Sequence, residues 1–387
     1  MGDLLGAAFA NTLAPDPVLI RQSEAYLKEA ASHPGYAVKV LELLSQDAVP
    51  EEIRQAAAVN FKNHVRFHWV SVKAGGWPCG CRWISWLGGK QPPPPVAAQV
   101  QRSGDEADAS AIQEPEKEQV KAHITDLMLR APPRVRAQLS EALSIVSSHD
   151  FPARWPGLLP QLLERLGGAG DDLAVASGVL GTADSIYRRY RDQFMTDQLS
   201  QELDYSQQLV APLLDVLRCL TRRLAEAGPA GDPATLRALL ANAELAANIF
   251  YSLNSPGLTQ AFEDTLDAWM AEFHALLTFE TAAVGERDAE KEGVLEACKA
   301  SVCECLILFM ERNEEEFAKF LQTFVQDIWT LLLKVTQDKG QVRGGAGGRG
   351  GAWGCRVLAV LAATRKPFHS SARDQSSACA ARRTGWR

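Results

Sequence analysis

The side chains best placed for chemistry are three closely spaced pairs of potential metal ligands. They are Cys79 and Cys81, Cys303 and Cys305, and His64 and His68. A structural zinc site needs two such pairs, usually with two residues between paired cysteines, and both cysteine pairs here have a single residue between them. The histidines are four residues apart, which suits one face of a helix, but no third ligand is near them in the sequence. We therefore expect no metal site, and we expect both histidines to pack or to face solvent.

The cysteines also indicate a reducing compartment. Cys298, Cys303 and Cys305 lie in the apolar stretch EACKASVCECLILFM, where thiols usually act as small buried hydrophobic side chains. The 8 cysteines are scattered along a chain of 387 residues and form no disulfide framework. This pattern is typical of cytosolic or nuclear proteins.

No catalytic motif is recognisable in the sequence. The chain has neither H-E-x-x-H nor G-x-S-x-G. Gly345, Gly347 and Gly350 match G-x-G-x-x-G, but no predicted strand precedes them and no helix clearly begins there, so a phosphate-binding loop is not indicated. We predict that the protein is not an enzyme and needs no cofactor.

The composition favours a folded protein that binds other proteins. Hydrophobic residues make up 46% of the chain and charged residues 22%, which excludes wholesale disorder and a membrane-spanning bundle. The formal net charge of -7 argues against general nucleic-acid binding, because phosphates would be repelled. The N-terminal segment lacks the basic region of a signal peptide, and the apolar run from Val357 is too short to cross a bilayer.

Apolar residues recur at helical spacing along most of the chain, and no convincing alternating strand is present. The stripes include Tyr36, Val40, Leu43 and Leu44; Val135, Leu139, Leu143 and Val146; and Phe317, Phe320, Phe324 and Ile328. Short separators with Pro, Gly or Asp give helix pairs that recur every 35 to 50 residues or so, roughly the range of HEAT and armadillo units. One pair cannot cover its own apolar faces, but stacked pairs can. The sequence therefore predicts an all-α fold, a HEAT-repeat α-solenoid in the form of a superhelical arch.

One connection between helices has a distinctive sequence, DFPARWPGLL, which runs from Asp150 to Leu159. Pro156 is predicted to lie in the first turn of the next helix, where a missing N–H costs no hydrogen bond. Asp150 is a residue type that caps helices, and it stands just ahead of Phe151. Trp155 is a rigid aromatic side chain that can fill the contact between successive helix pairs. We predict that Asp150, Phe151, Trp155 and Pro156 form a structural repeat junction.

Two charged runs leave alternatives open. YRRYR, from Tyr187 to Arg191, resembles a patch for phosphate or for an acidic partner, but it also suits a solvated helix end that complements the helix dipole. ERNEEEF, from Glu311 to Phe317, could receive a basic cargo or form a solvated helix start. The solvated helix end is the favoured interpretation in both cases.

Two stretches break the helical order. Residues 73–104 are rich in Gly, Pro and Trp, and residues 341–387 are basic and rich in Gly, Ala and Ser. Such composition fits a disordered insert and tail, although disordered segments are usually poor in Trp, so translated intron sequence or a splice variant is the preferred interpretation. The insert either disrupts the stacking of its neighbours or loops out, which costs little because closure entropy grows slowly with length.

Several segments make the chain similar to transport receptors of the importin-β superfamily. DFPARWPGLLPQLLERL resembles a segment of these receptors, and FKNHVRFHW resembles the end of their N-terminal domain. Further similar segments are PDPVLIRQSEAYLKEA, GTADSIYRRYRDQF, FYSLN, AFEDTLDAWMAEFHALLTF and EEFAKFLQTFVQDIWTLL. The resemblance implies an importin-β N-terminal domain with HEAT repeats 1 and 2 at 1–72 and further HEAT repeats of an exportin N-terminal arch at 105–340. These regions are separated by the irregular insert at 73–104 and followed by the irregular tail at 341–387.

The resemblance also implies partners and a location. Such a receptor binds Ran-GTP through inner helices of its first repeats, carries importin-α out of the nucleus and contacts Phe-Gly nucleoporins, without direct binding to nucleic acid or insertion into a membrane. It shuttles through the nuclear pore, so both nucleus and cytoplasm are expected. The alternative is a passive HEAT-repeat scaffold, or a truncated product without export activity.

By position, the resemblance implies a Ran-binding set on two inner helices. The helix expected at 19–30 and the second helix of repeat two would present Arg21, Glu24, Lys28, Asn60, Lys62, Asn63 and Arg66. Grooves near Phe262, Trp269 and Phe273 are candidates for Phe-Gly repeats, although these aromatic side chains more often belong to a core.

Overall fold

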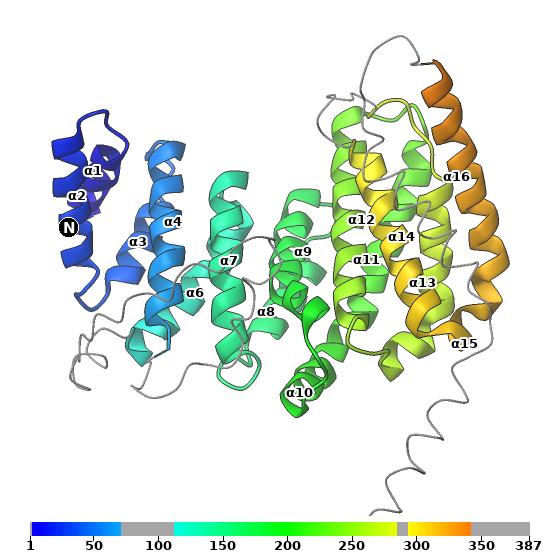
Figure 1. The fold of residues 1–387 in the computed structure, drawn as a ribbon, viewed down its shortest axis with the longest axis horizontal. Coiled ribbons are helices and arrows are strands. Elements are labelled where there is room, and N and C mark those ends of the chain that lie inside the picture. The colour runs from blue at the N-terminus through cyan, green and yellow to red at the C-terminus, as the bar shows by residue number, and fades with distance from the viewer. Residues whose placement is uncertain (1, 71–111, 285–292, 342–387) are drawn as a thin grey trace, which may run out of the picture. The chain divides into compact units, whose positions relative to one another are not determined.

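The structure is a computed structural model that describes residues 2–70, 112–284 and 293–341 (Figure 1). Every regular element in these ranges is a helix, so the all-α prediction is confirmed. The chain forms two compact units, residues 1–156 and 157–387. The predicted insert at 73–104 and nearly all of the predicted tail at 341–387 lie outside the described residues, and the domain boundaries stay a prediction.

Unit 1 consists of helices that pack as successive antiparallel pairs. They are α1 (Gly2–Thr12), α2 (Pro17–Ala30), α3 (Tyr36–Leu44), α4 (Glu51–His68), α6 (Glu114–Arg130) and α7 (Pro133–Asp150). Helix α1 packs against α2, α3 against α4 and α6, and α4 against α7. Each pair therefore covers the apolar face of the next pair, as a HEAT-repeat stack requires.

Unit 2 is built around its longest helix, α12. Its elements are α8 (Leu158–Gly168), α9 (Leu173–Tyr187), η1 (Arg188–Asp192), α10 (Asp197–Ser206), η2 (Gln207–Leu209), α11 (Val210–Ala227), α12 (Pro233–Asn254), α13 (Gln260–Thr278), α14 (Val294–Arg312), α15 (Glu314–Phe317), η3 (Ala318–Phe320) and α16 (Leu321–Gln341). Helix α12 packs against α9, α11 and α14, and α13 packs against α11, α14 and α16.

The predicted apolar stripes form the core of both units. Val135, Leu139, Leu143 and Val146 of α7 are completely buried, and the stripe of α3 is buried as well. Truncating a side chain in such a position to Ala costs about 2–5 kcal/mol. The stripes are therefore a main source of stability. The periodicity located them correctly except at Phe320, which is half-buried in η3.

An aromatic cluster lies in the core of unit 2. The ring of Phe250 on α12 lies between 4.8 and 5.5 Å, centroid to centroid, from those of Phe262, Trp269, Phe273 and Phe309. All five side chains are at most 1% exposed. Phe262, Trp269 and Phe273 are therefore core residues, as the favoured interpretation held, and their side chains are not exposed to a ligand.

The repeat junction is organised by a buried ion pair between α6 and the end of α7. Lys121 Nζ lies 2.9 Å from Asp150 Oδ2 and donates a hydrogen bond of 3.0 Å to the carbonyl oxygen of Arg154. Burial alone would lower the pKa of Lys121, but the hydrogen bonds and charges of Glu118 and Asp150 raise it, so the ammonium group is retained. The ammonium also lies 6.0 Å from the centre of the buried Trp155 ring. These contacts fix the path of the backbone after the last residue of α7.

The structure corrects the predicted helix boundaries at this junction. Asp150 is the last residue of α7 and not a cap ahead of the next helix, because its carboxylate is held by Lys121. Helix α8 begins at Leu158 with Gly157 as its N-cap, so Pro156 precedes the helix and does not lie in its first turn. Phe151 and Trp155 are buried, and Pro156 is exposed.

The helix pairs on either side of residues 71–111 stack on each other, with α3 against α6 and α4 against α7. Ile112 is buried, and its N–H donates to the carbonyl oxygen of His68 at 2.9 Å. Glu116, buried at the start of α6, accepts hydrogen bonds from the N–H groups of Gly35 and Ala37 at 2.7 and 2.9 Å. This carboxylate caps the N-terminus of α3, where negative charge is favourable. Stacking is thus continuous from α3–α4 to α6–α7.

We predict that deletion of residues 73–104 leaves unit 1 folded and slightly more stable. His68 and Ile112, which flank residues 71–111, are joined by a hydrogen bond, so a connection made of residues 71–72 and 105–111 is long enough to link them. A linker shortened about fourfold should raise the free energy of unfolding by about 1 kcal/mol. Circular dichroism and urea unfolding measure both effects.

The matched control replaces 73–104 with a Gly/Ser linker of the same length. It should unfold like the parent chain. Loss of helix content or a lower stability in the deletion variant would show that the segment takes part in the fold.

Candidate functional site

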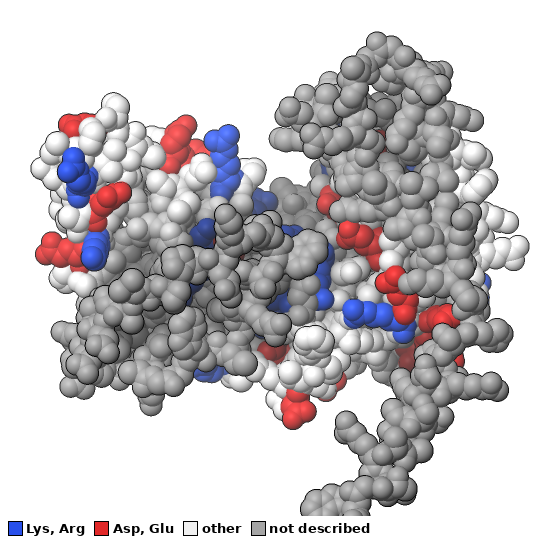
Figure 2. Space-filling view, viewed as in Figure 1, with Lys and Arg blue, Asp and Glu red and all other residues white. Residues whose placement is uncertain are grey.

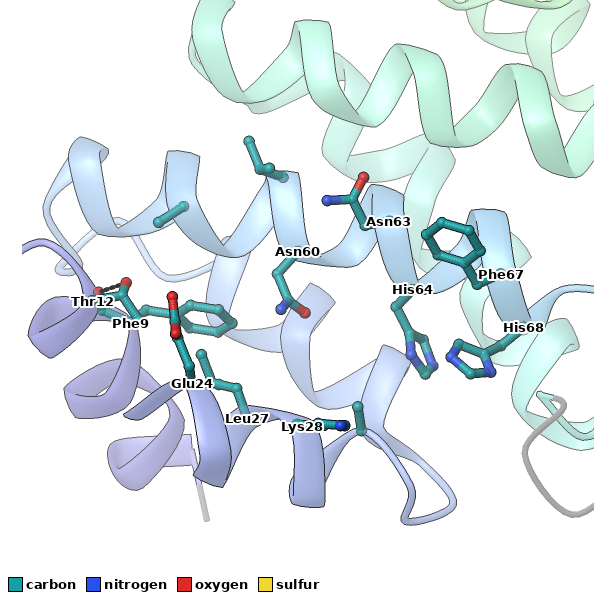
Figure 3. Close-up of a pocket in the computed structure, with 13 residues that line it drawn as sticks. Phe9, Thr12, Glu24, Leu27, Lys28, Asn60, Asn63, His64, Phe67 and His68 are labelled. Carbon is teal, nitrogen blue, oxygen red and sulfur yellow. Dashed lines mark hydrogen bonds between the residues drawn. The ribbon is translucent and has the colours of Figure 1, made fainter. Parts of the chain in front are cut away.

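A groove of about 410 Å³ lies in unit 1 between α1, α2 and α4 (Figure 3). Both polar and apolar side chains form its walls. Its lining residues are Phe9, Thr12, Glu24, Leu27, Lys28, Ala31, Ala56, Val59, Asn60, Asn63, His64, Phe67 and His68.

Helix α2 supplies one wall of the groove. It begins with Asp16 as N-cap, whose carboxylate accepts a backbone N–H at 2.8 Å, and with Pro17 in the first position. Glu24, Leu27 and Lys28 follow at spacings of three and four residues, so they share one face of the helix. Leu27 is buried, whereas Glu24 and Lys28 are exposed at the groove.

Helix α4 supplies the opposite wall. Acidic residues in its first turn and Arg66 in its last turn complement the helix dipole. Figure 3 shows Asn60, His64 and His68 pointing from α4 towards α2, while Asn63 and Phe67 lie on the rim. The side chains one turn apart along α4 thus line the groove over much of its length.

Internal contacts hold the α4 side of the groove in place. The hydroxyl of Tyr36 donates to Asn60 Oδ1 at 2.7 Å. The His64 ring packs edge-on against Tyr36 at 5.0 Å and lies 4.6 Å from the His68 ring. Burial, together with the smaller effect of charge on His68, lowers the pKa of His64 to about 4. His64 is therefore a neutral packing residue at neutral pH, as the sequence indicated.

Phe67 is the groove residue that sequence reasoning missed. Its side chain, next to the C-terminal end of α4, is 71% exposed, which is unusual for an aromatic residue. The available signal was its spacing, four residues after Asn63 and off the core stripe of Phe61 and Val65. With Val59, it adds apolar surface to a polar rim, and such mixed surfaces suit protein ligands.

The structure divides the seven predicted Ran-binding residues into two sets. Glu24, Lys28, Asn60 and Asn63 meet in the groove, and Arg21, Lys62 and Arg66 lie outside its lining. Lys62 is mostly buried, and its ammonium lies 3.1 Å from Glu141 of α7. Arg21 is exposed and donates to the carbonyl of Pro17 at 3.2 Å. Arg66 is exposed on α4.

The arginine cluster at 187–191 forms an internal network of hydrogen bonds and ion pairs. Most of its members are therefore neither a patch for phosphate or an acidic partner nor a solvated helix end, and both predictions are wrong for them. Arg189 lies 2.5 Å from the buried Glu202, which also accepts from the Tyr190 hydroxyl at 2.8 Å. Arg191 donates to Ser252 and to the carbonyl of Asn248 at 2.9 and 3.0 Å. Their charges connect η1 to α10 and α12 and are satisfied there.

The acidic run at 311–317 matches the favoured interpretation. Glu314 and Glu315 are exposed and stand in the first turn of α15. Negative charge is favourable at this end of a helix.

The cysteine and histidine pairs were the candidates for metal binding in the sequence. Within the described ranges, no three His, Cys, Asp or Glu side chains are grouped to hold a metal ion. Cys298, Cys303 and Cys305 are buried as predicted, and burial raises the pKa of Cys298 to about 12. Cys79, Cys81 and the glycines at 345, 347 and 350 lie outside the described residues.

None of the described helices is long and apolar enough to cross a bilayer.

Comparison with known families and solved structures shows which proteins the chain resembles. Residues 23–130 match the importin-beta N-terminal domain, and residues 186–341 match the Cse1 family. The fold is shared with the exportin Cse1 in its cargo-free, cytoplasmic state, with a TM-score of 0.76 over 95% of this chain and 35% of that chain at 24% identity. Lph2, a bidirectional nuclear transport receptor of S. cerevisiae, gives a TM-score of 0.63 over 92% of this chain and 31% of that chain at 15% identity. The chain therefore has the HEAT-repeat solenoid fold of nuclear transport receptors, as predicted.

In sequence, the chain is similar to exportin-2. It is 33% identical to exportin-2 of Oreochromis niloticus and of Homo sapiens over 330 residues, which is 85% of this chain and 30% of each relative. Exportin-2 of Xenopus laevis is also 33% identical, over 331 residues. The predicted resemblance to the importin-β superfamily is confirmed, and the chain spans about a third of the length of these relatives.

We predict that His64 makes the chain less stable as the pH falls from 6.5 towards 4. Over this range the unfolded chain binds a proton that the folded chain excludes, because the pKa of His64 is lowered from 6.5 to about 4 on folding. The free energy of unfolding should therefore drop by up to about 1.4 kcal/mol per pH unit. Urea unfolding at a series of pH values, for the parent chain and for His64→Gln, isolates this contribution.

His123→Gln is the control for this measurement, since His123 is exposed on α6. The control should keep the pH dependence of the parent chain, whereas His64→Gln should flatten it. Equal pH dependence in parent and His64→Gln would mean that His64 titrates normally in the folded chain.

Proposed function

We propose that the chain acts as the N-terminal part of a nuclear export receptor that binds Ran-GTP and accompanies importin-α from the nucleus to the cytoplasm. The observation that carries the proposal is the position of the groove. All of its lining residues except Phe9 and Thr12 lie in the region that matches the importin-beta N-terminal domain, in a chain similar to exportin-2. Four residues implied as Ran contacts by position meet in it.

The chemistry of the groove suits binding to a protein surface. Glu24 and Lys28 place opposite charges on one rim, and Asn63 offers an amide that can donate and accept on the other. Leu27 and Val59 contribute apolar surface between them. Rim charges of this kind affect mainly the association rate and its salt dependence, while apolar contacts slow the dissociation of the complex. The proposed role is binding without catalysis.

The other proposed partners follow from the same relationship. Importin-α would be the cargo, and Phe-Gly nucleoporins would guide the receptor through the pore between nucleus and cytoplasm. Because the chain spans 30% of its exportin-2 relatives, contacts made by their remaining parts are outside it. For each 1.4 kcal/mol of binding free energy that those contacts supply, their absence would make this chain bind tenfold more weakly.

We predict that the chain binds Ran loaded with a non-hydrolysable GTP analogue more tightly than Ran loaded with GDP. The variant Lys28→Glu/Asn63→Asp should weaken binding to the GTP form by about tenfold or more, because it adds negative charge on both sides of the groove. Both residues are exposed, so the fold should be retained. Isothermal titration calorimetry at low salt measures the affinities.

Arg134→Glu is the matched control, because Arg134 is exposed at the start of α7 and outside the groove. This variant should bind like the parent chain. Equal affinity for both nucleotide states would favour the passive scaffold. Selective binding that the groove variant leaves unchanged would place the Ran contact elsewhere.

A further inference from the structure

Phe67 lies at the edge of the groove, and the contacts of the helix that carries it fix its position. It is the next-to-last residue of α4, and Phe61 and Val65 of the same helix are completely buried. His64, on the side of α4 that faces α2, packs against Tyr36. Because these contacts prevent α4 from turning about its axis, the ring of Phe67 stays outside the core, with 71% of the side chain exposed.

The position of Phe67 distinguishes it from a scattered apolar residue. Single exposed apolar side chains are common on folded proteins and need no explanation. Among the large apolar side chains exposed in the described part of the chain, however, Phe67 and Val59 are the two that line the groove. They are about two helical turns apart on α4 with Asn63 between them, so the three form one row along the helix. Figure 3 shows Asn63 and Phe67 on the same side of α4.

The groove beside this row is apolar at its centre and polar at its rim. Phe9 of α1 and Leu27 of α2 line it and are almost completely buried, so its floor is apolar. Glu24 and Lys28 are exposed at the rim. In protein interfaces, an apolar centre inside a polar rim is where a few side chains supply most of the binding free energy. The volume of about 410 Å³ is large enough to admit side chains of a partner.

The charges near Phe67 indicate which kind of side chain it would meet. Arg66 directly precedes Phe67 and is exposed, and Lys28 lies across the groove on α2. Glu24 is the carboxylate among the lining residues. With a cation on each helix, the groove suits an apolar side chain that has a carboxylate beside it better than one that has a lysine or arginine beside it.

We infer that Phe67 is the apolar anchor of the Ran contact. Its ring and Val59 pack against an apolar side chain of Ran that enters the groove, and a carboxylate beside that side chain lies near Lys28 and Arg66. The inference rests on the proposed function and adds to it the residue that retains the partner. Rim charges speed the encounter, whereas burial of the Phe67 ring slows dissociation.

Surface plasmon resonance of the full chain on immobilised Ran, loaded with a non-hydrolysable GTP analogue or with GDP, measures both rates. Phe67→Ala should raise the dissociation rate from the GTP-analogue form about thirtyfold and leave the association rate nearly unchanged, because it removes a central aromatic contact. The increase should be similar at about 50 and 300 mM salt, unlike the effect of Lys28→Glu/Asn63→Asp. Phe67→Leu keeps an apolar side chain and should restore most of the affinity.

Phe194→Ala is the matched control. Phe194 is also an exposed aromatic residue, with 91% of its side chain exposed, but it lies in unit 2 and outside the groove. This variant should bind with the rates of the parent chain. Val59→Ala is a second test in case Phe67→Ala does not fold, as judged by circular dichroism. It truncates the other exposed apolar side chain of the groove and should raise the dissociation rate by a smaller factor.

The outcomes separate the inference from the proposed function. If the parent chain binds the GTP-analogue form selectively, and Phe67→Ala and Val59→Ala dissociate as slowly as the parent, the inference is wrong and the proposed function stands. An equal loss of affinity in Phe67→Ala and Phe194→Ala would also overturn the inference. A parent chain that binds neither nucleotide form would overturn both.

Discussion

One constraint shapes both units: a pair of amphipathic helices cannot bury its apolar faces alone, so each pair must stack on another. In unit 1, α4 is covered by α3 on one side and by α7 on the other. In unit 2, α12 lies between α9 and α14. The groove between α2 and α4 is a place where this stacking leaves helix faces uncovered.

Buried polar contacts fix the register of the stack. Lys121 and Asp150 are almost completely buried, and removing either partner would leave the other charge uncompensated, which typically costs about 3–5 kcal/mol. Glu116 connects α6 to the start of α3 through two backbone N–H groups. Apolar packing supplies most of the stability, and these directional contacts determine how one helix pair meets the next. The groove depends on that register, because α4 is held between α3 and α7.

The periodicity of the sequence predicted the helices and core stripes, since burial selects apolar residues at a fixed spacing. It could not predict contacts between residues distant in sequence. The pairing of Lys62 with Glu141 is one example, and the capture of Arg189 by Glu202 is another. The groove was half predicted, because the resemblance supplied Lys28 and neighbouring polar positions, whereas exposed Phe67 required the fold. Pro156 was wrongly predicted to lie in the first turn of the next helix, which begins at Leu158. The prediction relied on residue types alone, whereas the buried ion pair of Lys121 and Asp150 fixes the turn.

The central claim is that the groove between α2 and α4 recognises Ran in its GTP state. Hydrogen–deuterium exchange of the full chain, alone and with Ran in each nucleotide state, tests this most directly because it reports where protection arises. The account predicts that peptides from α2 and α4 become protected with the GTP-analogue form, and that peptides from α12 and α14 remain unchanged. Equal protection by both nucleotide states, or protection confined to elements outside the groove, would contradict it.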